Sequence, residues 1–279
     1  MNRDLVGKQY PEGVHEVTAE WIQAFARASN DDNPRYRGDD IVAPPLWHAA
    51  PGFPHSYQVS SDPNLGVDYS RVVHVEQEHV VHDVTRPGDK LVISSTLAAV
   101  DSGPEGSSYT VVAPVRRLDG ATVAEMRAKM FVLGTGPGYK PVWSRPDEPP
   151  SYEETTLVDE DQPRRWAEVT GDDNPIHLDR TAARKAGLRG IVLHGMCTMT
   201  LASTAAVNGP AGGDPTRVRR TAVRFSWPVI PGEEITTKLW ALGSDDALTT
   251  FGFETYNSKG KAVITDGRVE IGPPRSRGS

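Results

Sequence analysis

The stretch WAEVTGDDNPIH, residues 166–177, decides the fold because a version of it occurs earlier in the chain as FARASNDDNPRY, residues 25–36. The shared DDNP tetrapeptides lie 141 residues apart in a chain of 279. A second pair follows in the same order, since the Pro-Gly-acid turn at residues 87–89 has a counterpart at residues 231–233, an offset of 144. Two matches at nearly the same offset predict a duplicated domain of about 130 to 150 residues, an ordinary size for a single core.

The segments around these matches predict two domains and a linker. Between residues 134 and 154 proline and glycine recur too often for a helix or a central strand. We therefore expect a linker at 134–154, a first domain at 1–133 and a second at 155–279. In the second domain Met196–Asn208 is apolar nearly all round and uncharged, which is typical of a buried helix. Alternating β-branched and aromatic segments follow it, and they recur in the first domain. The prediction is an α+β fold in which an antiparallel sheet wraps a central helix, made twice.

The first copy departs from the second where the central helix is expected. Its segment IVAPPLWHAAPGFP, residues 41–54, contains Pro44, Pro45, Pro51 and Pro54. Proline removes a backbone donor and clashes with the preceding turn, so we expect this helix to be shortened or broken. Such a helix would leave space in the first domain; the alternative is a domain retained only for packing.

Composition excludes several classes of partner. Thirty basic and 37 acidic residues give a formal charge of -7, a poor match for nucleic acid. The first residues are charged, and no run of about 18 apolar residues occurs, so we expect no signal peptide, no membrane association and a cytoplasmic location. The single cysteine, Cys197, cannot form an intramolecular disulfide or a structural zinc site.

A more specific pattern lies in the second copy, where GDDNPIH at residues 171–177 is followed by LHGM at 193–196 and FSWPVIPGEEI at 225–235. This combination closely resembles the MaoC-like (R)-specific enoyl-CoA hydratases of the hydratase 2 type. The resemblance covers the second copy throughout and the first copy more loosely. It implies a double hot-dog fold and reversible (R)-specific hydration of 2-enoyl thioesters to (3R)-hydroxyacyl thioesters, with acyl-CoA as the first candidate substrate. It also implies that the first, non-catalytic hot-dog accommodates long or bulky acyl chains.

Hydration of a double bond conjugated to a thioester needs a base for the attacking water and an acid for the α-carbon. Asp172 and His177 can supply both, because imidazole titrates near neutrality and a carboxylate can orient the water. Which of the two takes the proton is left open. Asn174 is expected to fix these side chains, with a purely structural turn amide as the alternative. The resemblance gives the oxyanion role to the backbone N–H of Gly195, where a helix dipole favours negative charge.

The first copy lacks the histidine. Asp31, Asn33 and Tyr36 stand where the second copy has its aspartate, asparagine and histidine. Tyrosine, with an ordinary pKa of about 10, is a poor base at neutral pH. We therefore expect only the second domain to catalyse.

Residues expected to contact the substrate or its carrier flank the catalytic segment. They are His194 and Met196 at the start of the apolar helix, and Arg184, Lys185 and Arg189 before it. The basic side chains would suit a nucleotide phosphate or the acidic face of an acyl carrier protein, but solvated helix faces explain them equally well.

The prediction is thus a hydro-lyase that uses no metal and no cofactor. The nearest alternative is a dehydratase for fatty or polyketide intermediates bound to acyl carrier protein. The alternative from another class is a non-catalytic thioester-binding or scaffold subunit. A homodimer is the candidate assembly. The sequence specifies neither the acyl chain, nor the physiological direction, nor the oligomeric state.

Overall fold

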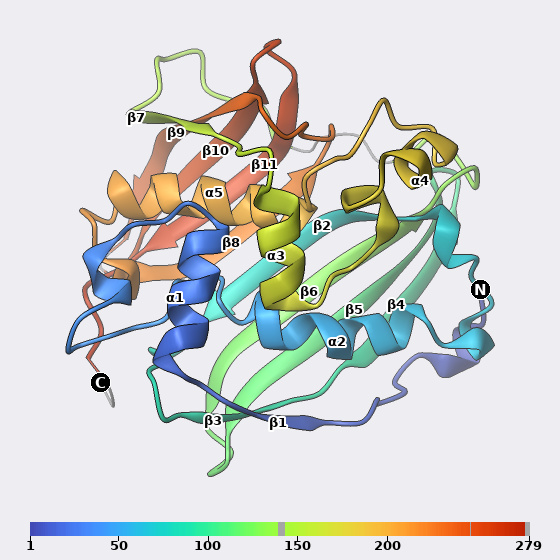
Figure 1. Cartoon of the computed structure of the whole chain (residues 1–279), viewed down its shortest axis with the longest axis horizontal. Coiled ribbons are helices and arrows are strands. Elements are labelled where there is room, and N and C mark those ends of the chain that lie inside the picture. Colours follow the sequence, from blue (N-terminus) through green and yellow to red (C-terminus); the bar gives the residue numbers. More distant parts are fainter. Residues whose placement is uncertain (139–142, 246, 277–279) are drawn as a thin grey trace.

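One antiparallel sheet of 11 strands runs through the part of the chain that the structure describes (Figure 1). This computed structural model describes residues 1–138, 143–245 and 247–276, so residues 139–142 of the predicted linker, and residues 246 and 277–279 of the predicted second domain, lie outside it. The strand order is β1-β3-β5-β6-β2-β8-β11-β10-β9-β7, with β4 paired to β5. The strands are β1 (Gly13–Glu16), β2 (Val72–Val81), β3 (Lys90–Ile93), β4 (Thr96–Gly103), β5 (Gly106–Arg117), β6 (Thr122–Val132), β7 (Tyr152–Leu157), β8 (Val218–Phe225), β9 (Glu234–Ser244), β10 (Thr249–Asn257) and β11 (Ala262–Ile271).

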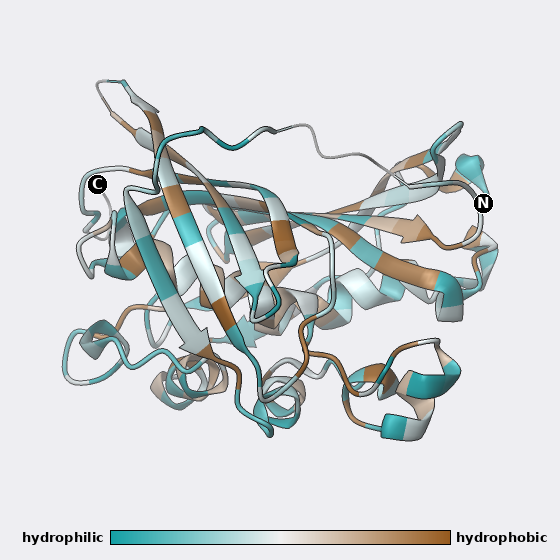
Figure 2. Ribbon diagram, turned by 90° about the horizontal axis from the view of Figure 1, so that it is seen from above, coloured by the Kyte–Doolittle hydropathy of each residue, from teal (hydrophilic) through white to brown (hydrophobic). Residues whose placement is uncertain are grey.

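The helices gather on one face of the curved sheet, as the two perpendicular views show (Figures 1 and 2). The α-helices are α1 (Ala19–Ala28), α2 (Ala49–Ser60), α3 (Gln162–Thr170), α4 (Arg180–Lys185) and α5 (Gly195–Asn208). Short 3-10 helices are η1 (Arg3–Leu5), η2 (Pro34–Tyr36), η3 (Pro63–Leu65), η4 (Tyr69–Arg71), η5 (Pro175–His177) and η6 (Pro215–Arg217). None of the described helices is long and apolar enough to cross a membrane.

The sequence repeat is also a structural repeat. Gly88 donates its N–H to the carbonyl of Val17 (2.8 Å), and Gly232 donates to the carbonyl of Val158 (2.7 Å). Both glycines are in the left-handed region, with φ of 89° and 90°, which a side chain would disfavour. The two Pro-Gly-acid turns therefore hold the same connection in each half, and the predicted α+β architecture with two central helices is confirmed.

The two halves join edge to edge through β2 and β8, so their sheets are continuous. Ion pairs cross this seam between Glu76 and Arg224 (3.0 Å) and between Glu78 and Arg220 (2.5 Å). The opposite charges face each other on neighbouring strands, which favours this register. β7 begins at Tyr152, inside the predicted linker, and it forms an edge of the sheet where neighbouring prolines are tolerated.

Helix α5 is the predicted buried helix of the second half. Ten of its residues are buried, in line with its lack of charge. Its residues pack with strands β8, β9 and β11 in one apolar cluster, which includes Met199, Val223, Leu239 and Ile264. A side chain placed at the start of this helix is therefore held by a closely packed core.

The first half also has its helix, α2, and of the two expected alternatives, a shortened or a broken helix, the structure shows the first. The helix has 12 residues against 14 in α5, so it is shorter but continuous. Pro51 lies in the first turn, where no intrahelical donor is needed, and only Pro54 removes an internal hydrogen bond. His48 and His194 precede the two helices at equivalent places. A broken helix therefore does not create space in the first half.

Candidate active site

The catalytic segment begins where α3 ends. Gly171 has a left-handed φ of 77° and terminates the helix, so the chain turns directly into the DDNP sequence. Pro175 then starts η5, and the side chain of Asn174 accepts a hydrogen bond from the N–H of Ile176 (3.3 Å). Asp172 accepts a longer bond from the N–H of Asn174 (3.4 Å). The contacts of Asn174 thus fix the turn that carries Asp172 and His177.

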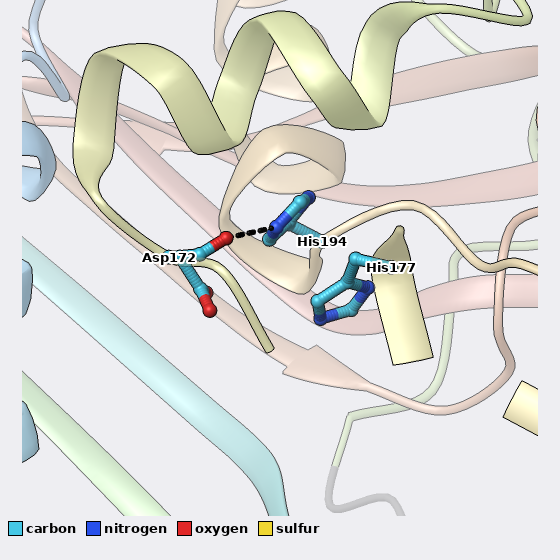
Figure 3. Close-up of side chains that lie close together, drawn as sticks. All are labelled: Asp172, His177 and His194. Carbon is cyan, nitrogen blue, oxygen red and sulfur yellow. Dashed lines mark hydrogen bonds between the residues drawn. The ribbon is translucent and has the colours of Figure 1, made fainter. Parts of the chain in front are cut away.

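Three side chains meet at this turn: Asp172, His177 and His194 (Figure 3). One carboxylate oxygen and one nitrogen of each ring lie within 4.8 Å of one another. The two rings stack, with centroids 3.8 Å apart and an interplanar angle of 28°. Among the described residues this is the one group of three His, Cys, Asp or Glu side chains close enough to hold a metal ion. The prediction that the reaction needs no metal is not tested by this geometry.

Backbone carbonyls fix the tautomer of each histidine. His177 Nδ1 lies 2.8 Å from the carbonyl oxygen of Val192, and His194 Nε2 lies 2.9 Å from that of Asp172. A carbonyl only accepts, so both of these nitrogens carry the hydrogen. His177 Nε2 therefore has a free lone pair, as has the buried Nδ1 of His194.

Burial shifts the pKa of each of the three groups in the direction that favours its neutral form. It raises the pKa of Asp172 to about 6, with an opposing hydrogen bond from the N–H of Asn174 and a further rise from the Asp173 charge. It lowers the pKa of His177 to about 4. Burial and the neighbouring His177 lower that of His194 to about 3. At pH 7 the site thus holds one carboxylate and two neutral imidazoles, and the carboxylate is the strongest base.

The N-terminus of α5 lies beside this cluster, since His194 directly precedes Gly195. In the described part of the chain the Gly195 N–H has no hydrogen-bond acceptor. A Cβ at Gly195 would lie 3.4 Å from the nearest ring atoms of Phe225. The Phe225 ring in turn meets the His74 ring edge-on, with ring centroids 4.9 Å apart. The ring of Phe225, which the sequence analysis did not single out, thus forms a wall next to this donor.

The other predicted contacts are distributed differently. Met196 is half-buried and packs against the core at the start of α5. Arg184 and Lys185 on α4 and Arg189 after it are exposed, and none forms an ion pair with a described residue. They are free to meet a charged group from solution, but the structure does not place them against the three-residue cluster.

In the first half the equivalent residues are used for packing. Thr204 on α5 donates a hydrogen bond to the carboxylate of Asp31 (2.9 Å), and Asn33 donates to the carbonyl of Gly213 (2.9 Å). Tyr36 is only 2% exposed. The first N–H groups of α2 are also occupied, because Ala49 and Ala50 donate to the carbonyls of residues 46 and 47. This half therefore has neither an open base nor a free helix N-terminus.

Comparison with known proteins agrees with this geometry. The family model described as "MaoC like domain" matches residues 142–261, and "FAS1-like, dehydratase domain region" matches residues 4–126. The chain is 30% identical over 212 residues to 3-hydroxyacyl-thioester dehydratase Y of Mycobacterium tuberculosis, covering 71% of this chain and 72% of that protein. The chain belongs to the MaoC-like dehydratase family. It is accordingly an enzyme of the hydro-lyase class.

This MaoC-like dehydratase also resembles a longer relative and two solved structures. It is 29% identical over 270 residues to peroxisomal multifunctional enzyme type 2 of Drosophila melanogaster. The match covers 90% of this chain and 44% of the Drosophila protein, so the chain spans less than half of that relative's length. The crystal structure of a MaoC-like dehydratase from Phytophthora capsici superposes with a TM-score of 0.84 at 20% identity and covers all of both chains. A Mycobacterium tuberculosis protein described as a double hotdog fold gives a TM-score of 0.60 at 14% identity over 96% of each chain. These two likenesses confirm the predicted double hot-dog fold.

Proposed function

We propose that this enzyme hydrates 2-enoyl thioesters to (3R)-hydroxyacyl thioesters, and catalyses the reverse dehydration, with acyl-CoA as substrate. One observation carries the proposal: the Asp172 carboxylate and the His177 imidazole lie within 4.8 Å of each other, beside a helix whose first N–H has no acceptor among the described residues. This arrangement offers a water-activating pair and an oxyanion donor at one place. The (R) configuration rests on the resemblance to the hydratase 2 type.

The spacing of Asp172 and His177 suits one bridging water. A water that donates both hydrogens over about 2.8 Å each holds its two acceptors about 4.6 Å apart. The two side chains have atoms within 4.8 Å. His177 accepts through Nε2, because its Nδ1–H is engaged by Val192. The oxygen of this water is then held with a lone pair directed away from both acceptors.

The pKa values support one order of proton transfers. Asp172, with a pKa of about 6, is a stronger base than His177, with a pKa of about 4, so Asp172 takes the proton of the water. The water oxygen bonds to the β-carbon, and the π-electron pair moves through the α-carbon to the thioester oxygen. The Gly195 N–H stabilises this enolate oxygen, aided by the positive end of α5. The electron pair then returns to form the bond between the α-carbon and a proton supplied by the Asp172–His177 pair.

We further propose that the second half alone catalyses. The first half has Tyr36 in place of the histidine, and its Asp31 is already bonded to Thr204. Its helix N-terminus has no free donor at Ala49 or Ala50. Three separate requirements of the reaction are thus unmet there.

The carrier group of the substrate is tested separately, because coenzyme A and acyl carrier protein present the same thioester. Exposed Arg184, Lys185 and Arg189 suit the phosphates of coenzyme A as well as an acidic protein face. Coenzyme A is proposed, and parallel assays with crotonyl-CoA and crotonyl-acyl carrier protein distinguish the two. A clear preference for the protein-bound substrate would replace acyl-CoA in the proposal.

The decisive assay uses purified protein and crotonyl-CoA. Loss of absorbance of the conjugated thioester with formation of (3R)-3-hydroxybutyryl-CoA supports the proposed function. An (S) product would reject the stereochemistry. No turnover on either carrier, with thioester binding retained, would favour a non-catalytic binding subunit.

A further inference from the structure

The turn before β2 and the turn before β8 are equivalent elements of the repeat. The first reads DYSRV at residues 68–72 and the second DPTRV at residues 214–218. Asp68 accepts hydrogen bonds from the N–H and hydroxyl of Ser70 at 3.1 and 2.6 Å. Asp214 accepts the same two bonds from Thr216 at 2.9 and 2.8 Å. The backbone of the two turns is thus fixed in the same way, and Tyr69 occupies the place of Pro215.

The second turn lies next to the DDNP sequence of the first half. Asn33 belongs to the first half, which we call the silent half because its DDNP sequence lacks the histidine. It donates a hydrogen bond to the carbonyl of Gly213, which immediately precedes the second turn. The repeat places the first turn correspondingly beside the DDNP sequence of the catalytic half. In agreement, the charges of Asp172 and Asp173 help burial to raise the pKa of Tyr69. The symmetry of the repeat and the influence of these charges thus put Tyr69 near Asp172, where the corresponding turn beside the first DDNP sequence has Pro215.

Tyr69 is the end of a row of three aromatic rings. Its ring meets that of Tyr57 edge-on, with centroids 5.3 Å apart at 83°. Tyr57 in turn lies parallel to Phe53, 6.0 Å away at 23°. Phe53 and Tyr57 come from the continuous helix α2, and Tyr57 is 43% exposed. We call Phe53, Tyr57 and Tyr69 the aromatic row.

We propose that Tyr69, at the end of the aromatic row, makes the enzyme prefer thioesters whose β-carbon bears a planar ring. This inference rests on the proposed function, because the β-carbon must lie over the water held by Asp172. A ring on that carbon would extend the row at the spacing its members already have. Aromatic pairs at such distances gain interaction energy beyond that of equal apolar area. The advantage over an alkyl group with the same number of carbons should be about threefold to tenfold in kcat/KM.

The test compares two substrates in the dehydration direction: (3R)-3-hydroxy-3-phenylpropanoyl-CoA and (3R)-3-hydroxynonanoyl-CoA, whose β-carbons carry a phenyl and a hexyl group. The full-length protein should prefer the phenyl substrate. Tyr69→Leu, which keeps the bulk but removes the ring, should lower the ratio of kcat/KM values about threefold or more, mainly through KM. Tyr69→Phe should keep the ratio. Tyr256→Leu, on strand β10, is the off-site control and should also keep it.

Any other result contradicts either the role of the aromatic row or the proposed function. A hexyl preference in the unaltered protein, or an unchanged ratio in Tyr69→Leu, would overturn the role of the aromatic row while the proposed function stands. An equal loss on both substrates in Tyr69→Leu would show a structural role for the ring and would also overturn it. Failure of the unaltered protein to dehydrate either substrate, together with inactivity on crotonyl-CoA, would reject the proposed function itself.

Discussion

His177 and His194 stack ring on ring, 3.8 Å apart, and each donates its one hydrogen to a backbone carbonyl. Two imidazolium ions at this distance would repel strongly, and burial opposes even the first charge. The pair therefore stays neutral across the working pH range. His194 also donates a hydrogen bond to the backbone carbonyl of Asp172, so one histidine holds the aspartate in place, while we propose that the other shares its water.

The pH dependence should follow Asp172. Its pKa is raised to about 6, and the base must be ionised, so kcat/KM should fall as the pH drops through about 6 and level off above it. His177, with a pKa lowered to about 4, adds no limb above pH 5. A pH–rate profile of the hydration of crotonyl-CoA measures this limb. A profile that is flat between pH 5 and 7 would contradict the assignment of Asp172 as base.

The residue next to the base provides an internal check. The charge of Asp173 raises the pKa of Asp172, so Asp173→Asn should move the acid limb to lower pH and leave the plateau rate nearly unchanged. The comparison is made on the same pH–rate profile. A shift to higher pH would show that the Asp173 carboxylate does not act on the base in this way.

Gly195→Ala should lower kcat about tenfold or more with little loss of stability. Alanine is favoured in a helix, and the silent half has Ala49 at this place, so the fold accepts it. The added methyl would contact Phe225 at 3.4 Å and occupy space beside the oxyanion donor. Steady-state kinetics and a thermal unfolding curve separate the two effects. An unchanged kcat would mean that the enolate oxygen binds elsewhere.

Substitutions at Tyr36 test the silence of the first half. Tyr36→Phe should leave turnover nearly intact, because the hydroxyl takes no part in the chemistry. Tyr36→His in a His177→Ala background should not restore activity, since Thr204 occupies Asp31 and the helix N-terminus there has no free donor. Turnover is measured on crotonyl-CoA. Loss of turnover in Tyr36→Phe, or its recovery when Tyr36→His is added to His177→Ala, would contradict this account.

The sequence predicted much of this molecule because its decisive features are local. The DDNP repeat, the uncharged stretch of α5 and the alternating strands each carry their own signal. The prolines before and in α2 were misleading, since Pro51 lies in the first turn and costs no hydrogen bond. Tyr69 and Phe225 were missed as site residues because their positions depend on contacts between elements distant in sequence. The DxxRV pair at residues 68–72 and 214–218 was the available signal for the first of them.

The central claim is that Asp172 and His177 act as one pair on one water molecule. The direct measurement is kcat on crotonyl-CoA for Asp172→Ala, His177→Ala and the double variant, with folding checked by circular dichroism. Each single change should cost on the order of a hundredfold or more, and the double change little beyond that, because groups acting as a unit fail together. Losses that multiply in the double variant would show two independent roles and contradict the shared water.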